Sequence, residues 1–290
     1  MIKSRSIAVS VLAFAALTGG YSASFAAGGG GDGHGVKIER QEWSFSGPSG
    51  KYDSQQLQRG FGVYKEVCAA CHGLSRIAFR NLAQPGGPAF NVEQVKALAA
   101  TYEVPDEPDD EGEVKPRPAR LADRFPPLFA NEKAARAAQN GALPPDLSII
   151  AKARGVAYSG TWYQHPIAML KDIATAYQEG GADYIYALMT GYKDAPASMK
   201  MSEGMNYNTV YPGHQIAMAA PLSDGLDLYN DGTPETADNY ARDVAAFLSW
   251  TSDPTLNERK SLGWMVMIFL LITSVLLYIS KRRIWASAKH

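Results

Sequence analysis

Cysteine and surplus basic charge are both scarce in this sequence. Two cysteines among 290 residues exclude a protein built on a disulfide framework. The 28 Lys and Arg residues are balanced by 29 Asp and Glu residues, so the basic excess typical of nucleic-acid-binding surfaces is missing. Hydrophobic residues make up 46% and charged residues 20% of the chain, which excludes a collagen-like or wholly disordered protein. The composition therefore predicts a folded domain that does not bind nucleic acid.

The N-terminus has the pattern of a secretory signal peptide. Lys3 and Arg5 precede a short apolar run, and small residues follow as far as Ala26. The run is shorter than the ~20 residues that a membrane span needs, which favours a cleaved signal over an uncleaved anchor. We expect residues 1–26 to be removed. We expect residues 27–50, which begin with a glycine-rich stretch, to form a flexible N-terminal segment.

The C-terminus carries a long uncharged run. Leu262 to Ser280 holds no charged residue in 19 positions, which is enough for one transmembrane helix. Basic residues stand on both sides of it, and Trp264 and Trp285 fit the two membrane interfaces. The expected organisation is an exported domain, a transmembrane helix and a cytoplasmic tail, over residues 51–254, 261–280 and 281–290.

The exported part is acidic although the whole chain is nearly neutral. Without the signal peptide and the tail, 22 basic residues remain against 29 acidic ones, a net charge of −7. Seven of the eleven residues from Glu103 to Glu113 are acidic. This stretch is interpreted either as a solvated, mobile insert or as a docking surface for a basic partner.

Both cysteines belong to one motif, Cys68-Ala-Ala-Cys71-His72, which is typical of c-type haem attachment. The two thiols form thioethers with the haem vinyl groups, and the histidine that follows becomes the proximal iron ligand. A thioredoxin-like pair would need a βαβ setting, and a structural zinc site would need further Cys or His at metal spacing. A disulfide is the third alternative in an oxidising compartment. The motif predicts one covalently bound haem.

Two amphipathic segments are expected to form crossing helices beside this motif. The first begins at Asp53 or Ser54, runs to about Val67, and places four apolar residues on one face: Leu57, Phe61, Tyr64 and Val67. Gly60 lets a second helix approach closely. The second runs from about Glu235 to Trp250, with Tyr240, Val244, Phe247 and Leu248 on one face. Such a crossing beside the haem motif is the scaffold of class I c-type cytochromes.

Methionine is the usual second axial ligand of a high-potential haem. Met218 lies in a non-helical, largely apolar segment from Tyr211 to Leu222, and is favoured over His214, which stands four residues before it. Met169 and Met189 are expected in the core because they stand at helical spacing among apolar residues. Three further methionines fall in a polar stretch that is expected to be a surface loop: Met199, Met201 and Met205. On the residues alone, His214 stays open as an alternative ligand.

Several segments resemble the cytochrome c1 family, the haem subunits of quinol–cytochrome c reductase (the cytochrome bc1 complex). They are RGFGVYKEVCAACHG (59–73), ARAAQNGALPPDLSIIAKAR (135–154), DYIYALMTGY (183–192), YPGHQIAMAAPL (211–222) and DGTPETADNYARDVAAFLSWTSDP (231–254). The resemblance implies a mainly α fold. It would be a class I c-type cytochrome domain with long loops and insertions, plus one C-terminal transmembrane helix.

The resemblance also implies roles for individual residues. Cys68 and Cys71 would hold the haem, with His72 and Met218 as the two iron ligands. A backbone carbonyl at Pro144-Pro145 would accept the ring N–H of His72. Arg154 and Tyr184 would contact a haem propionate, although a solvated surface charge explains Arg154 equally well. Residues 155–181, which include His165, look longer than in mitochondrial members.

The implied function is electron transfer, with no catalytic residue in this chain. The haem would accept an electron from the Rieske iron–sulfur protein and pass it to a soluble or tethered cytochrome c. The chain would pack against a cytochrome b subunit in a dimeric complex, in a bacterial inner membrane with its haem domain on the periplasmic side. Two other classes compete. One is a membrane-tethered cytochrome c carrier or oxidase subunit, and the other is a haem peroxidase, which needs an open distal position.

Overall fold

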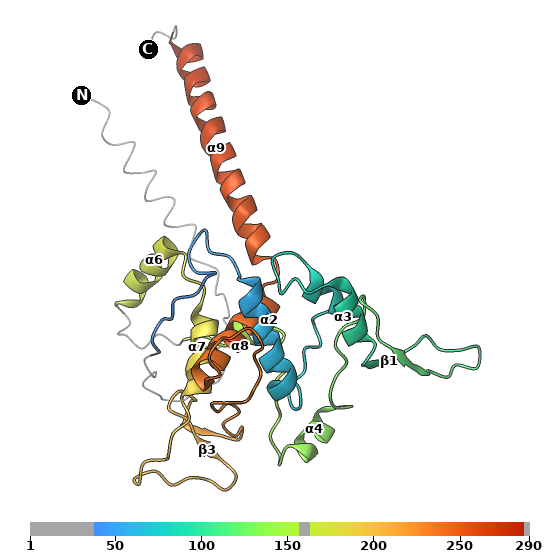
Figure 1. Ribbon diagram of the computed structural model, residues 1–290. Helices are drawn as coiled ribbons and strands as arrows, with labels where there is room; N and C mark the ends of the chain where they lie inside the picture. The colour runs from blue at the N-terminus through green and yellow to red at the C-terminus, as the bar shows by residue number, and fades with distance from the viewer. Residues whose placement is uncertain (1–37, 157–162, 287–290) are drawn as a thin grey trace. The chain divides into compact units, whose positions relative to one another are not determined.

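A computed structural model of the chain describes residues 38–156 and 163–286. The expected signal peptide, the glycine-rich start of 27–50 and the end of the tail lie outside these described residues. The fold is mainly helical, as expected (Figure 1). Its helices are α2 (Ser54–Val63), α3 (Val92–Ala99), α4 (Glu132–Ala138), α5 (Ile150–Ala153), α6 (His165–Thr175), α7 (Gly180–Thr190), α8 (Ala237–Ser252) and α9 (Leu256–Trp285), with a π-helical turn η1 (Tyr64–Cys68) and a 3-10 helix η2 (Phe79–Ala83).

Helices α2 and α8 cross as the sequence predicts (Figure 1). Asp53 is the N-cap of α2, since its carboxylate accepts the backbone N–H of Gln55 at 2.8 Å. The helix continues through η1, so helical backbone reaches Cys68. A methyl carbon at Gly60 would lie only 2.1 Å from the carbonyl oxygen of Asp243, so this crossing requires glycine.

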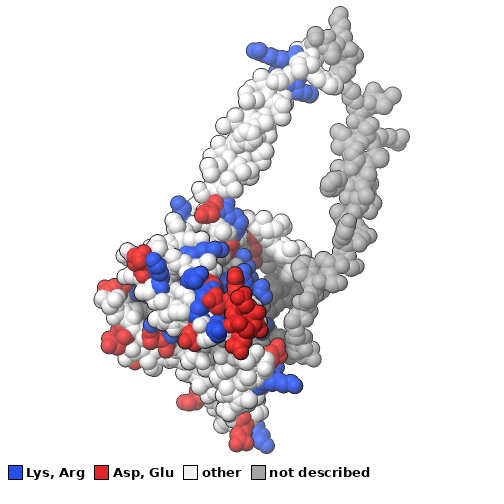
Figure 2. All heavy atoms as spheres, turned by 90° about the vertical axis from the view of Figure 1, so that its right-hand side faces the viewer, with Lys and Arg blue, Asp and Glu red and all other residues white. Residues whose placement is uncertain are grey.

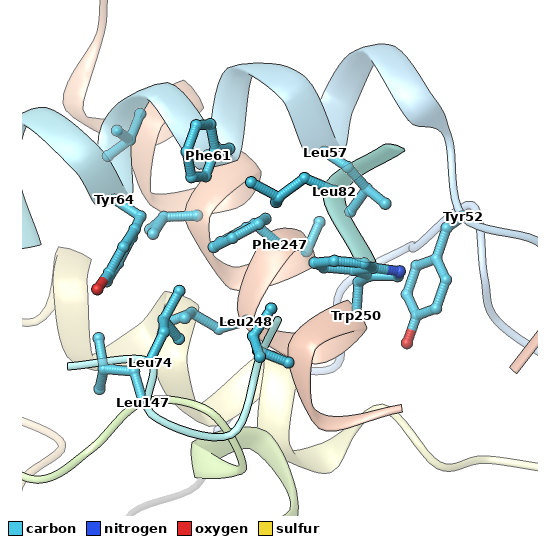
Figure 3. Close-up of a cluster of buried hydrophobic side chains, with 14 of the residues drawn as sticks. Tyr52, Leu57, Phe61, Tyr64, Leu74, Leu82, Leu147, Phe247, Leu248 and Trp250 are labelled. Carbon is cyan, nitrogen blue, oxygen red and sulfur yellow. The ribbon is translucent and has the colours of Figure 1, made fainter. Parts of the chain in front are cut away.

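The hydrophobic core lies around this crossing (Figure 3). Aromatic rings from both helices meet there, with Phe61 and Phe247 5.6 Å apart between centroids. Tyr64 is buried beside them, and its hydroxyl points toward the side of Leu74 and Leu147 (Figure 3). The core thus reaches from the helix crossing to the segments that follow the haem motif and Pro145.

The N-terminal segment corrects one expectation. Within 27–50, the described residues from Ile38 onward do not form a flexible tether, because Trp43 and Phe45 are buried in the core. The indole N–H of Trp43 donates to the buried carboxylate of Asp183 at 2.8 Å. Two large aromatic side chains so close in sequence bury enough apolar surface to hold this segment against the core. The folded domain therefore begins before residue 51.

Helices α5 and α7 pack closely at the end of the crossing pair. A methyl carbon at Gly181 would lie 1.7 Å from the carbonyl oxygen of Ala151. Met189 of α7 packs partly buried against the core, as expected. Met169 does not, because it lies on α6 and is 51% exposed. The helical spacing around Met169 is real, but the apolar face of α6 is not turned into the core.

Two short antiparallel hairpins complete the fold: β1 (Glu103–Pro105) with β2 (Pro116–Pro118), and β3 (Asn206–Tyr207) with β4 (Gln215–Ile216). The acidic stretch 103–113 starts in β1 and forms the exposed loop of the first hairpin. Figure 2 shows acidic side chains gathered on the face that carries this hairpin. Asp109 accepts from the Lys115 ammonium at 2.7 Å across the loop.

Helix α9 contains the expected transmembrane run and extends beyond 261–280 at both ends. Among the described residues, it is the one helix long and apolar enough to cross a membrane. The Lys260 ammonium donates to the backbone carbonyl of Phe45 at 2.6 Å. The start of the anchor is therefore fastened to the N-terminal segment of the folded domain.

Candidate functional site

The haem motif lies where the π-helical turn η1 ends. The backbone N–H groups of Cys71 and His72 both donate to the Cys68 carbonyl, at 3.1 and 2.9 Å, which closes a tight turn. Both thiols are unpaired, so the disulfide alternative is absent from this structure. Burial raises the pKa of the Cys68 thiol to about 12, with a further contribution from Cys71. Cys68 is therefore a neutral thiol at neutral pH.

A zinc site finds no support at this turn. Across residues 38–156 and 163–286, no group of three or more Cys, His, Asp or Glu side chains is placed to hold a metal ion. The motif supplies two sulfurs and one imidazole, while a structural zinc site needs four ligands.

The ring of His72 is held by the loop that contains Pro145. Nδ1 of His72 lies 2.8 Å from the Pro145 carbonyl oxygen. Because a carbonyl only accepts, Nδ1 carries the proton, and Nε2 keeps its lone pair for a metal. Burial lowers the pKa of His72, against the opposing effect of the Pro145 carbonyl, so the ring is neutral at neutral pH. The tautomer and the charge are those of an iron ligand.

A set of hydrogen bonds fastens the Pro145 loop to the segment after the motif. Asp146 accepts the backbone N–H of Ser75 at 2.8 Å and that of Ser148 at 2.9 Å. The backbone N–H of Leu147 donates to the Gly73 carbonyl at 2.9 Å. Burial alone would raise the pKa of Asp146, but the hydrogen bonds from Ser148 and Ser75 lower it below its ordinary value. The carboxylate is therefore ionised where it joins the two segments.

Asp146 is a positioning residue that the sequence analysis missed. The Asp-Leu-Ser spacing is a turn signal, since an aspartate often accepts the backbone N–H two residues later. That signal predicts the bond to Ser148, and the bond to Ser75 becomes visible only in the fold. Tyr64 adds a second support, because its hydroxyl donates to the His72 carbonyl at 2.9 Å.

The segment around Met218 is non-helical, as predicted, and Met218 is half-buried. The hydroxyl of Tyr192 donates to the backbone carbonyl of Met218 at 3.2 Å. This bond ties the segment to the residues after α7. Since the bond uses the main chain of Met218, the thioether takes no part in it.

His214, the alternative ligand, is built into the turn between β3 and β4. Its backbone is left-handed, with φ +59°. Its Nδ1 lies 3.1 Å from the Asn208 carbonyl, and its own carbonyl accepts the Asn208 N–H at 3.0 Å. The residue shapes the hairpin, which gives it a structural role that Met218 lacks.

Arg154 and Tyr184 lie near each other, on α5 and α7. Arg154 is the C-cap of α5, and Tyr184 is half-buried in α7. Burial raises the pKa of the Tyr184 hydroxyl, the charge of Arg154 opposes this shift, and Tyr211 adds to it. The two residues expected to contact a propionate therefore share one electrostatic environment, next to the segment that leads to Met218.

These residues fit a haem by their chemistry. Two free thiols stand at thioether spacing, the neutral imidazole has its distal nitrogen free, and a methionine thioether lies in a non-helical segment. Arg154 lies close enough to Tyr184 for its charge to oppose the rise that burial causes in the pKa of the Tyr184 hydroxyl, and both side chains can donate to a carboxylate.

Comparison with known proteins identifies the family of the chain. The model of the Cytochrome C1 family matches residues 43–288. Cytochrome c1 of Blastochloris viridis is 46% identical over 250 residues, which cover 86% of each chain. Cytochrome c1 of Rhodospirillum rubrum is 41% identical over 272 residues, covering 88% of this chain and 90% of that one. The match to the Cytochrome b/c1 protein of Bradyrhizobium diazoefficiens, 46% identical, covers 98% of this chain and 40% of that protein. The family model matches nearly the whole folded part, which contains the turn of the haem motif and the histidine held by a carbonyl. The chain therefore belongs to the cytochrome c1 family.

Proposed function

We propose that this chain is the haem-bearing electron-transfer subunit of a quinol–cytochrome c reductase. The observation that carries the proposal is the 2.8 Å bond between His72 Nδ1 and the Pro145 carbonyl, beside two unpaired thiols. This bond presets one imidazole nitrogen as a metal ligand at the only Cys-x-x-Cys-His in the sequence. A haem bound here supplies a one-electron carrier.

Cys68 and Cys71 attach a single haem covalently, and His72 is its proximal ligand. Met218 would be the second residue that holds the iron. The half-burial of Met218 and its tether to Tyr192 support this assignment, as does the structural use of His214 in its own turn. A thioether ligand in an apolar setting favours a high potential. Since His72 and Met218 would both hold the iron, the bound haem would supply one-electron transfer.

Arg154 and Tyr184 bind a haem propionate. A guanidinium beside a tyrosine hydroxyl offers a carboxylate both charge and a hydrogen bond in a partly buried position. The influence of Arg154 on the pKa of Tyr184 supports a shared site for the two residues.

The partners follow from the family. The chain accepts electrons from a Rieske iron–sulfur protein and delivers them to a soluble or tethered cytochrome c. Its anchor packs against a cytochrome b subunit in a dimeric complex. Residues 1–26 are a signal peptide, and the domain is periplasmic on a bacterial inner membrane, with residues 281–290 in the cytoplasm. A short basic tail fits the cytoplasmic side.

The test of the haem site is a reduced-minus-oxidised spectrum and a redox titration of the full-length membrane protein. We expect one covalent low-spin haem whose potential falls sharply in Met218→Leu. Met205→Leu is the matched control, because Met205 lies in an exposed loop. An unchanged potential in Met218→Leu would reject Met218 and make His214 the next ligand to test. The absence of covalent haem would reject the whole proposal.

The test of the partners is purification of the tagged chain from membranes. We expect cytochrome b and Rieske subunits to accompany it and quinol-dependent reduction of its haem to follow. Recovery of the chain alone would instead support a free membrane-tethered carrier.

A further inference from the structure

Helix α6 exposes an apolar face that covers no part of the folded domain. Ile167, Leu170 and Ile173 are 69%, 66% and 71% exposed. Successive members stand three residues apart, so they share one face of the helix. None of the residues of α6 is buried. This face lies outside the haem site and takes no part in the proposed function.

The opposite face of α6 is fastened to the domain. Asp172 pairs with the Arg40 guanidinium at 2.6 Å, and the same guanidinium lies 3.7 Å from the centre of the Tyr177 ring. Thr175 stands three residues after Asp172 and lies on the same side, while Lys171 lies at the border beside Ile167. Charges on one side and aliphatic side chains on the other make α6 amphipathic, in the pattern of helices that lie in a membrane interface.

The end of α6 lies close to the start of the membrane anchor. Gln178, three residues beyond the end of α6, accepts from the Arg259 guanidinium at 3.4 Å. Arg259 and Lys260 are the last charged residues before the uncharged run that begins at Leu262. Three residues span at most ~10 Å. The last turn of α6 therefore lies near the end of α9 at which the uncharged run begins.

We propose that α6 is an interfacial helix, whose Ile167, Leu170 and Ile173 insert into the outer surface of the membrane that α9 spans. We expect lipid, not a protein, to cover this apolar face. The bond between Gln178 and Arg259 connects the end of α6 to the residues just before the membrane-spanning part of α9. α6 would fix the tilt of the haem domain above the membrane as a second contact beside the anchor.

The experiment places a nitroxide spin label on α6 in the full-length chain. Ile173→Cys puts the label on the apolar face, and Thr175→Cys, in the same turn, puts it on the polar face as the matched control. The protein, within its purified complex, is reconstituted into vesicles of phosphatidylcholine and phosphatidylglycerol. Collisions of the label with oxygen, which partitions into lipid, and with a water-soluble nickel chelate are then compared. Leu170→Cys gives the same measurement from the preceding turn if the Ile173 variant does not assemble.

We expect the label at 173 to collide with oxygen severalfold more than with nickel, and the label at 175 to show the reverse. Nickel access at both positions would overturn the proposal. Shielding of position 173 from both reagents would also overturn it, because the face would then be covered by a partner protein. The parent chain is treated identically as a separate check of the haem assignment. It takes up no label if Cys68 and Cys71 carry haem, and labelling of the parent chain would count against the haem assignment and not against the placement of α6.

Discussion

Replacing Asp146 by alanine tests whether the loop that orients His72 is held by this one carboxylate. The substitution removes the acceptor of two backbone hydrogen bonds, from Ser75 at 2.8 Å and Ser148 at 2.9 Å. These bonds fix the residue next to Pro145, whose carbonyl holds the His72 ring. We expect the folded state to lose stability and the ring of His72 to lose its fixed orientation.

The size of the effect follows from those two bonds. Hydrogen bonds to a charged group contribute about 1.5–3 kcal/mol each, so the pair gives about 3–6 kcal/mol. Asp146 is only half-buried, which weakens its charge interactions through solvent screening and favours the lower end of this range. We therefore expect a loss of about 3 kcal/mol in the free energy of unfolding.

The assay is denaturant unfolding of the full-length protein in detergent, followed by the absorbance of its haem. Asp109→Ala is the matched control, because Asp109 also accepts a backbone N–H, from Glu113 at 2.8 Å, but lies in the exposed hairpin loop. We expect Asp109→Ala to have nearly the stability of the parent protein, because solvent screens the interactions of an exposed loop. Equal stabilities of the two variants, with an unchanged low-spin spectrum in Asp146→Ala, would refute the role assigned to Asp146.

The same residue predicts a pH dependence. The pKa of Asp146 in the fold lies below its ordinary value of 3.8, so its carboxylate stabilises the fold at all pH values above 3.8. This contribution is lost as the pH falls through the lower, folded value. We expect Asp146→Asn to be less stable than the parent at neutral pH, and the difference between the two to shrink below pH 3.8. A difference that stays constant into acid would contradict the assignment.

Three further predictions address the helix crossing, the Met218 segment and the acidic hairpin. Gly60→Ala should lower the free energy of unfolding by about 1–3 kcal/mol, because the new methyl carbon would lie 2.1 Å from the Asp243 carbonyl oxygen. Gly62→Ala is the control, since its methyl carbon would meet nothing nearer than 4.0 Å, and it should be neutral or stabilising in the same denaturant titration. Tyr192→Phe removes the 3.2 Å bond to the Met218 carbonyl and should weaken the methionine–iron charge-transfer band as the pH or temperature rises, while the band in the parent protein persists. Neutralising the exposed acids Glu107, Asp110 and Glu111 together should slow electron delivery to a basic cytochrome c at low salt and flatten its salt dependence, and an unchanged salt slope would remove this hairpin as the docking surface.

Much of the site could be predicted because its signals are local in the chain. The spacing of Cys68, Cys71 and His72 carries its chemistry within five residues, and the cap at Asp53 and the apolar spacing around Phe61 define one helix. Gly60 indicates a close crossing. Glycine destabilises the interior of a helix, and its lack of a side chain is useful there when another backbone must approach closely. The second helix is recognisable by the same periodicity. The pairing of α2 with α8 could thus be anticipated across a long separation in sequence.

Other features depend on neighbours that periodicity does not identify. The spacing around Met169 predicts an apolar helix face correctly, but not whether that face meets the core, solvent or lipid. Trp43 and Phe45 follow a glycine-rich stretch and lack a helical pattern, so only their burial shows that the domain begins before residue 51. Asp146 has a local turn partner in Ser148, but its bond to Ser75 joins segments 71 residues apart.

The sequence by itself determined the kind of chemistry, the anchor and the helix pair, because each depends on residue types at short, fixed spacing. Tertiary structure alone decided the tautomer of His72, the structural task of His214 and the exposure of α6. The tautomer of His72 depends on the Pro145 carbonyl, which comes from 73 residues away, and the task of His214 depends on the Asn208 carbonyl across its hairpin turn. A hydrogen bond or a buried face needs a partner in space, and that partner exists only once the chain has folded.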